Sequence, residues 1–302
     1  MSLPLAARVA AAVDRSLDPA VAGIARELGE ETKALAVLFY GSNLRTGSLE
    51  GVLDFYVLLP GPRETGIWPH VSYREWDRAG HGLRAKIATM NLATFAKAAA
   101  GETLDTTIWA RFVQPCAIAW ARDTAAQQSV LEALAAAAFT AARLAVTVGP
   151  ERGSEDDYWR ALFRATYRAE LRVEPPGREE SILSANRAHF DGLLPAALSH
   201  GGIPFGQDQT TIEPRLELAE RRRTQRWWAR RRRVGKLLNA VRLVRATTTF
   251  EGGMRYVAWK VERHTGVPVK VTPLREKMPI LAVPSLAWHL WRSRKGPIAP
   301  GK

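Results

Sequence analysis

Residues 36–60 read AVLFYGSNLRTGSLEGVLDFYVLLP, in which two apolar runs flank a polar loop that contains glycine. Short apolar runs bounded by such a loop are typical of buried strands. One carboxylate, that of Asp54, lies inside the second run, between Leu53 and Phe55. Burial of an unpaired charge is unfavourable, so we expect this aspartate to have a partner.

A strand, a Gly-Ser loop and a second strand that carries an acid together favour phosphate chemistry. Gly41 allows the backbone to approach a phosphate closely, and Ser42 offers a hydroxyl and an amide to phosphate oxygens. Asp54 returns to the same end of the sheet on the paired strand, where it can hold Mg²⁺ beside a triphosphate. The alternative is an ordinary hairpin with a serine-bearing turn and an Asp54 exposed at the sheet edge.

The rest of the chain predicts an α+β protein with a mixed sheet in its first part. We expect an N-terminal domain at 1–122, a helical domain at 123–250 and a basic, aromatic C-terminal segment at 251–302. The expected strands are 34–40, 52–59 and 85–90, and the expected helices are 4–16, 20–28, 92–100, 104–113, 124–147, 158–173, 182–197 and 213–247.

Composition limits the classes of function. The formal net charge of +13 and the pI near 10.3 predict attraction to polyanions. A single cysteine, Cys116, excludes an intramolecular disulfide and a multi-cysteine zinc site. The longest apolar segment, 130–148, is rich in alanine and contains Glu132 and Arg143, which favours a buried helix over a membrane span. We therefore expect a soluble or peripheral protein.

The run RRRTQRWWARRRRVGK at 221–236 contains nine basic residues and no acid. It suits an anionic membrane surface, with arginines on headgroups and Trp227 and Trp228 at the interface. A solvated helix with inward tryptophans is the second interpretation, and nucleic acid is the least favoured partner. The expected membrane or lipid-phosphate contacts are Arg230, Arg231, Lys260, Arg263, Trp288 and Trp291, although the last two suit core packing almost as well.

Three segments together resemble a known family. They are FYGSNLRTGSLEGVLDFYVLL, RAKIATMNL and ETLDTTIWARFVQPCAI, which lie within residues 37–118. They resemble the nucleotidyltransferase superfamily that includes DNA polymerase beta. Within it, they are most similar to the mitochondrial-type phosphatidate cytidylyltransferases, the translocator assembly and maintenance proteins.

The resemblance implies a nucleotidyltransferase fold for the N-terminal domain and a role for six residues. Gly41, Ser42 and Asn43 would bind the nucleotide, Asp54 would bind Mg²⁺, and Lys86 and Arg111 would offset phosphate charge during catalysis. Many superfamily members have a second acid where this chain has Tyr56, so the second metal ligand stays open among Glu50, Asp77 and Asp105. The changed segment WPHVSY leaves His70, Ser72 and Tyr73 without an assigned role.

The expected function is transfer of CMP from CTP to a membrane-lipid phosphate, with Mg²⁺ as cofactor. Phosphatidate is the default acceptor, giving CDP-diacylglycerol and pyrophosphate at the cytoplasmic face of the membrane. Two alternatives stay open. One is a nucleotidyltransferase that acts on RNA or a soluble metabolite, and the other is a non-catalytic membrane-surface module.

Overall fold

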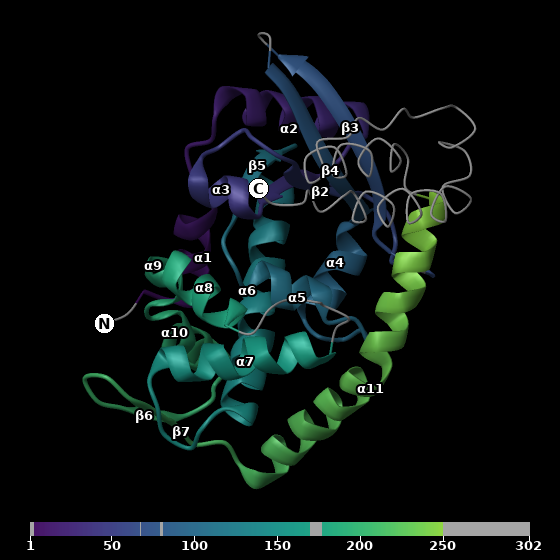
Figure 1. Ribbon diagram of the computed structural model, residues 1–302. Helices are drawn as coiled ribbons and strands as arrows, with labels where there is room; N and C mark the ends of the chain where they lie inside the picture. The colour runs from purple at the N-terminus through teal and green to yellow at the C-terminus, as the bar shows by residue number, and fades with distance from the viewer. Residues whose placement is uncertain (1–2, 67, 79–80, 170–176, 250–302) are drawn as a thin grey trace, which may run out of the picture.

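A computed structural model of the 302-residue chain describes residues 3–66, 68–78, 81–169 and 177–249, with side chains up to residue 235 in the last helix. Within these residues the protein is mixed α+β, with a mixed five-stranded sheet followed by helices (Figure 1). The coarse fold prediction is therefore confirmed. The expected C-terminal segment 251–302, with Lys260, Arg263, Trp288 and Trp291, lies outside the described residues.

The large sheet has the strand order β3-β4-β2-β1-β5. Strands β2 and β4 run parallel, and the other neighbouring pairs are antiparallel. The sequence did not reveal β3 or β5, because charged residues interrupt the apolar pattern of the first and the second is a short run after Pro115. The strands are β1 Ala36–Tyr40, β2 Leu53–Leu59, β3 His70–Arg78, β4 His81–Asn91 and β5 Cys116–Ala121, and a separate small hairpin is formed by β6 Phe205–Gln207 and β7 Ile212–Pro214.

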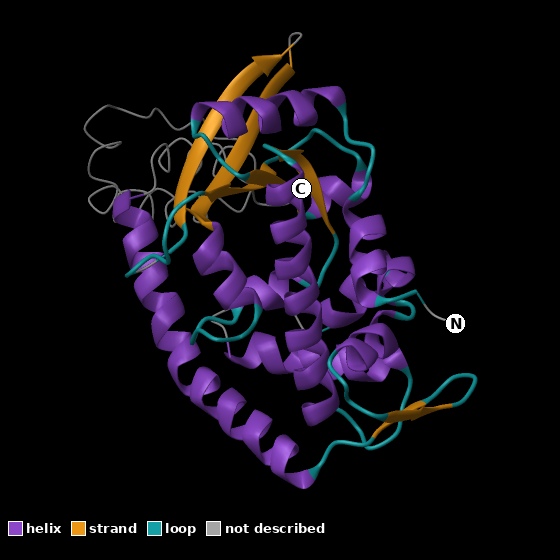
Figure 2. Cartoon of the chain, turned by 180° about the vertical axis from the view of Figure 1, so that it is seen from behind, coloured by secondary structure: helices purple, strands orange, loops and turns teal. Residues whose placement is uncertain are grey.

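The two faces of this sheet are covered by different helices. Helix α2 (Pro19–Glu31) packs on one face, where its Ile24 and Leu28 join Leu53 and Phe55 in one hydrophobic cluster (Figure 2). The opposite face packs against α4 (Leu92–Ala99), α5 (Thr107–Phe112) and α6 (Thr124–Val148). Side chains alternate between the faces of a strand, so residues 54 and 56 must point toward the α4–α6 side.

Apart from the short helix α3 (Ser42–Thr46), whose Leu44 packs against the cluster on the α2 side, the remaining helices lie on the α6 side of the sheet. The expected single helix at 182–197 is wrong, because the backbone leaves the helical region at Asn186 (φ −129°) and again at Gly192 (φ 72°). The remaining helices are α1 Leu5–Val13, α7 Glu155–Ala169, α8 Arg178–Ala185, α9 Arg187–Phe190, α10 Leu193–His200 and α11 Leu218–Thr249.

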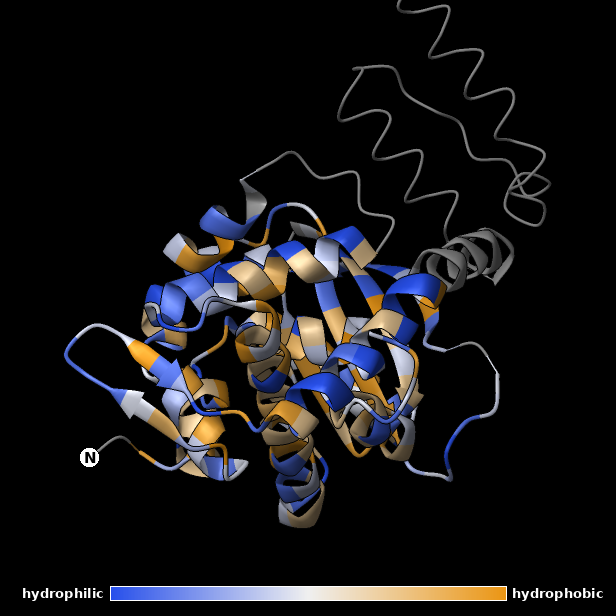
Figure 3. Ribbon diagram, turned by 90° about the horizontal axis from the view of Figure 1, so that it is seen from below, coloured by the Kyte–Doolittle hydropathy of each residue, from blue (hydrophilic) through white to orange (hydrophobic). Residues whose placement is uncertain are grey.

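The expected boundary at residue 122 does not separate two hydrophobic cores. One cluster of buried side chains joins the sheet residues Leu38 and Tyr56 to Leu144 of α6, Trp159 of α7 and Leu194 of α10. Figure 3 shows hydrophobic residues gathered inside this packing and hydrophilic residues on the outer helix surfaces. Helix α6 is long and apolar enough to cross a membrane, but 72% of its most apolar window is buried inside the protein, as the sequence predicted.

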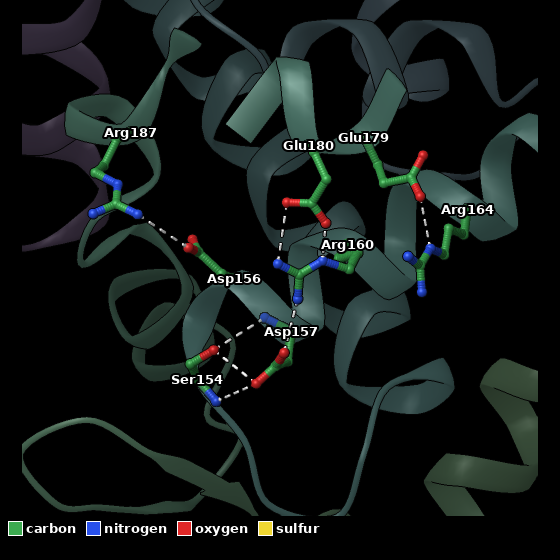
Figure 4. A network of polar contacts seen from close by, with 8 residues as sticks. All are labelled: Ser154, Asp156, Asp157, Arg160, Arg164, Glu179, Glu180 and Arg187. Atoms are coloured by element: carbon green, nitrogen blue, oxygen red, sulfur yellow. Dashed lines mark hydrogen bonds and ion pairs between the residues drawn. The ribbon is translucent and has the colours of Figure 1, made fainter. Parts of the chain in front are cut away.

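Ion pairs fasten α7 to the short helix that follows it (Figure 4). Ser154 and Asp157 form a capping box at the start of α7, with Ser154 N donating to Asp157 Oδ2 at 2.9 Å. Arg160 pairs with Glu180, and Arg164 pairs with Glu179 at 2.8 Å. These contacts hold α8 against α7 and are structural.

Candidate active site

Four polar or aromatic residues form one row across the sheet. Tyr40 of β1 is paired with Asp54 of β2, Asp54 with Lys86 of β4, and Lys86 with Tyr73 of β3. Directly paired residues on neighbouring strands lie on the same face of a sheet. The structure therefore brings Asp54 and Lys86 together, as the sequence predicted, and adds two tyrosines to the row.

The position of Asp54 between apolar neighbours follows from the two-sided packing of β2. Leu53 and Phe55 are fully buried against α2, so Asp54 points to the other face. There its side chain is only partly buried, and Lys86 and Arg111 are the charges that act on it. The aspartate is thus not an unpaired charge in the core, which answers the question raised by the sequence.

Gly41 directly faces the carboxylate of Asp54. Its backbone has φ +94°, a conformation that favours glycine, and a Cβ atom at this position would lie 2.8 Å from Asp54 Oδ2. The space beside the carboxylate therefore exists because residue 41 has no side chain. This close approach of a bare backbone to an acid is the most specific geometric feature of the site.

Arg111 enters the site from α5 and is the second cation near Asp54. Its guanidinium carbon lies 5.3 Å from the ring centre of Tyr40, a cation–π contact that orients the arginine over the row. Burial raises the pKa of Tyr40 to about 12, with the Asp54 charge acting in the same direction and Arg111 opposing it. Tyr40 is therefore a neutral phenol whose ring supports Arg111.

The charges around Asp54 oppose one another. Burial raises the pKa of the Asp54 carboxyl above its ordinary value, while the positive charges of Lys86 and Arg111 act to lower it. A carboxyl that the fold makes costly to ionise, flanked by two cations, is the kind of group that functional sites contain.

The polar loop that the sequence predicts after β1 begins as the short helix α3. Ser42 is exposed, so its hydroxyl is accessible. Asn43 is buried at 6% exposure, and its side-chain amide donates to the carbonyls of Ser48 and Glu50 at 2.8 Å each. The Asn43 side chain thus shapes the loop, and only its backbone is available for the nucleotide role implied by the resemblance.

The candidates for a second metal ligand differ in their surroundings. Asp105 is buried and accepts hydrogen bonds from Thr107 N and Oγ1, both at 2.6 Å, so it caps α5. Asp77 of β3 is paired with Gly82 of β4. It lies four residues, roughly 13 Å along the strand, from Tyr73 and so from the row that contains Asp54. Glu50 is exposed in the loop. Among the residues that the structure describes, no group of three or more acids, histidines or cysteines is arranged to hold a metal ion.

One partly buried carboxylate beside an open backbone nevertheless fits Mg²⁺. This ion is commonly held by one or two carboxylates and takes its remaining ligands from substrate phosphates and water. Asp54 supplies the carboxylate, and the missing Cβ at Gly41 leaves room beside it. The donor set is thus suited to an ion that arrives with its nucleotide.

Sequence reasoning missed a second polar group on the same face, one step further along β3 and β4. Tyr73 Oη donates to Glu75 Oε1 at 2.7 Å, and Arg84 Nε lies 3.5 Å from the same oxygen. The spacing of two between Tyr73 and Glu75, and between Arg84 and Lys86, was the available signal. It was obscured because β3 itself was not predicted.

Two of the expected membrane contacts fall on the described part of α11, and only one is accessible. Arg230 is exposed, but Arg231 is 5% exposed and donates hydrogen bonds to the carbonyls of Gly101 and Thr103. The prediction that Arg231 contacts a membrane surface is therefore wrong, because its guanidinium fastens α11 to the turn between α4 and α5.

The tryptophans of α11 also point inward. The rings of Trp227 and Trp228 lie 5.9 and 6.2 Å from that of Trp109, and Trp227 Nε1 donates to Gly101 O at 2.9 Å. The predicted interfacial role of these two residues is wrong, and the interpretation with inward tryptophans holds for them.

The described residues thus define a mixed α+β protein with one carboxylate, two cations and a close glycine at the end of a five-stranded sheet. Comparison of the chain with protein-family models and with curated proteins found no significant match.

Proposed function

We propose that the chain is a Mg²⁺-dependent nucleotidyltransferase that transfers CMP from CTP to a lipid phosphate. The observation that carries this proposal is the approach of Gly41 to Asp54, where a Cβ atom would lie 2.8 Å from the carboxylate. Phosphate oxygens can approach such a backbone closely while a metal held by the acid neutralises their charge. The Gly-Ser loop, the mixed sheet and the acid on the adjacent strand support assignment of the nucleotidyltransferase fold.

The residues around Asp54 have suitable chemistry for this transfer. Bound Mg²⁺ would supply charge neutralisation on the triphosphate and polarise the alpha phosphorus. Asp54 would hold the ion, Ser42 would donate to phosphate oxygens, and Lys86 and Arg111 would stabilise negative charge as it moves onto the leaving group. The ring of Tyr40 would keep Arg111 oriented over the row.

The reaction needs no strong general base. An ionised phosphate oxygen of the acceptor attacks the alpha phosphorus of CTP and forms a new oxygen–phosphorus bond. The bond from the alpha phosphorus to the bridging oxygen breaks, and pyrophosphate leaves with that oxygen and the electron pair. Because the acceptor oxygen is already an anion near neutral pH, catalysis depends on alignment and charge stabilisation.

The acceptor is proposed as phosphatidate, with the protein bound peripherally at the cytoplasmic face of a membrane. The resemblance of residues 37–118 to phosphatidate cytidylyltransferases supports this choice, and the strongly basic composition suits an anionic surface. RNA or a soluble metabolite would be the acceptor under the alternative hypothesis.

A transfer assay tests the proposal. The protein is incubated with Mg²⁺ and each common nucleoside triphosphate, labelled at the alpha phosphorus, in the presence of phosphatidate vesicles, RNA or no acceptor. We expect label in the lipid with CTP and its loss in Asp54→Asn. Label only in RNA or a soluble product would overturn the lipid acceptor, and no turnover with any nucleotide would overturn the enzymatic function.

A further inference from the structure

The exposed arginines of α11 form one continuous stripe. Arg222, Arg226, Arg230 and Arg233 recur at spacings of four, four and three, which places them on one face of a helix, and each is exposed. The stripe spans twelve residues, from Arg222 to Arg233, and roughly 16 Å along the helix axis. Figure 1 shows that α11 runs along the outside of the helical layer.

The opposite face of α11 is fixed to the protein. Thr224, Trp228 and Arg231 are buried, and Arg231 lies 3.9 Å from the ring centre of Trp227 while it bonds the turn after α4. The four stripe arginines are therefore carried on a helix that cannot rotate to hide them. This differs from a mobile basic tail, because the charges are displayed in a set geometry.

The stripe has no acidic partner within the described residues. Several exposed arginines elsewhere are ion-paired, for example Arg78 with Glu27, Arg122 with Asp123 and Arg152 with Asp208. No carboxylate lies within 4.0 Å of a stripe arginine among the residues that the structure describes. The sequence beyond residue 249 carries ten lysines or arginines and three glutamates, so it adds positive charge in excess. Like charges four residues apart destabilise a helix, and a polyanionic partner would relieve this repulsion.

We infer that this stripe docks the protein onto an anionic lipid surface through electrostatic attraction to its phosphate groups. Arginine binds phosphate groups well because its planar guanidinium can donate two parallel hydrogen bonds. Inward packing of Trp227 and Trp228 removes both the interfacial anchors and the stacking platform that single-stranded nucleic acid requires. The choice of a membrane over a nucleic acid rests on the proposed lipid-phosphate acceptor.

Vesicle binding tests the inference without turnover. Wild type is compared with Arg222→Gln, Arg226→Gln, Arg230→Gln and Arg233→Gln combined, on vesicles of phosphatidylcholine with or without phosphatidylglycerol. The matched control neutralises four exposed arginines elsewhere, Arg63, Arg122, Arg187 and Arg215, so both variants change the net charge from +13 to +9 (13 − 4 = 9). We expect the stripe variant to lose roughly a hundredfold in partitioning onto anionic vesicles, and the control to lose less than about tenfold.

Three results of the vesicle-binding experiment would overturn the inference. The first is an equal loss of vesicle binding in the two variants, and the second is no preference of wild type for vesicles that contain phosphatidylglycerol. The third is displacement of wild type by duplex RNA at a lower concentration of RNA phosphate than the concentration of lipid phosphate that binding to vesicles requires. An assay of CMP transfer to a short-chain, water-soluble phosphatidate distinguishes failure of this inference from failure of the proposed function, because it requires no binding to a membrane. The stripe variant keeps that activity if the stripe only docks the protein, whereas Asp54→Asn loses it and still binds vesicles. Loss of the soluble activity in the stripe variant would also contradict a docking role.

Discussion

The carboxylate of Asp54 lies where a side chain on Gly41 would have to go. A Cβ atom at residue 41 would be 2.8 Å from Asp54 Oδ2, closer than carbon and oxygen atoms normally approach. The two residues are neighbours because Tyr40, the last residue of β1, is paired with Asp54 near the start of β2. Gly41 follows Tyr40 directly and therefore lies beside the acid. The position of the Asp54 carboxylate is thus one reason why residue 41 must be glycine.

Gly41→Ala is expected to reduce nucleotide transfer by at least about a hundredfold, because the methyl group must displace the Asp54 carboxylate. Gly47→Ala is the matched control, since Gly47 also has a positive φ (+68°) but nothing lies within 4 Å of its Cβ position. Gly47 is in the left-handed helical region, where a side chain costs about 1–2 kcal/mol. Gly41, with φ +94° and ψ −162°, is in a region that almost only glycine adopts, where the cost is roughly 1–3 kcal/mol. Urea unfolding of both variants measures these losses of stability. Equal activity in the two variants would show that the space beside Asp54 is not used.

Asp54→Asn is expected to abolish transfer and to stabilise the protein at neutral pH by on the order of 1 kcal/mol. Burial raises the pKa of Asp54, so the folded state disfavours the ionised form and the neutral isostere relieves that penalty. As pH falls through the raised pKa, Asp54 of the folded wild type becomes protonated and this penalty disappears. The difference in free energy of unfolding between variant and wild type should therefore shrink as the pH is lowered. A variant that is less stable than wild type at pH 7 would instead indicate a structural ion pair.

Lys86→Met is expected to lower transfer by about a hundredfold and to move the acidic limb of the pH–rate profile to higher pH. Lys86 lowers the pKa of Asp54, so its removal leaves the effect of burial less opposed. Lys97→Met on the outer surface of α4 removes the same charge and serves as the control. An acidic limb that does not move would show that the charge of Lys86 does not influence the ionisation of Asp54 during catalysis.

Arg231→Met and Arg230→Met are expected to differ sharply although the residues are adjacent. Arg231 is buried and satisfies the carbonyls of Gly101 and Thr103, so its loss should destabilise the protein by about 2–4 kcal/mol. Arg230 is exposed, and its replacement should change the free energy of unfolding by less than about 0.5 kcal/mol. Similar values for the two variants, from urea unfolding monitored by circular dichroism, would contradict the inward orientation of Arg231.

Acid destabilisation between about pH 4 and pH 6.5 is expected to depend on His189. Burial lowers its pKa to about 4, and its Nε2–H donates to Val113 O at 2.9 Å. Between these pH values His189 binds a proton in the unfolded chain but not in the folded chain, so the free energy of unfolding falls as pH falls from 6.5 toward 4. His189→Asn should flatten that part of the stability curve, and an unchanged slope would assign the effect to other groups.

The sequence predicted the first part of the site better than its surroundings. The strands around Gly41 and Asp54 were predictable because their apolar runs are short, continuous and bounded by glycine or proline. Strand β3 was not, because Arg74, Glu75 and Asp77 obscure its alternation, and with it the Tyr73–Glu75–Arg84 group was missed. Sequence spacing alone does not reveal which strands become neighbours.

The arginine-rich helix shows a second limit. Its composition favoured a membrane surface that Arg230, Arg231 and the two tryptophans contact, with inward tryptophans as the second interpretation, but the packing places these residues on different faces of the helix. Trp228 and Arg231 are buried against the α4–α5 region, while Arg230 and its neighbours at helical spacing stay exposed. A helix that is basic on all sides carries no apolar stripe from which its buried face can be predicted.

The most direct test of the central claim is a crystal structure with Mg²⁺ and a CTP analogue whose alpha–beta bridge cannot be cleaved. We expect the triphosphate beside Gly41 and Ser42, with Asp54 on the metal and Lys86 and Arg111 on phosphate oxygens. Nucleotide bound elsewhere, with no ligand or ion at Asp54, would contradict it.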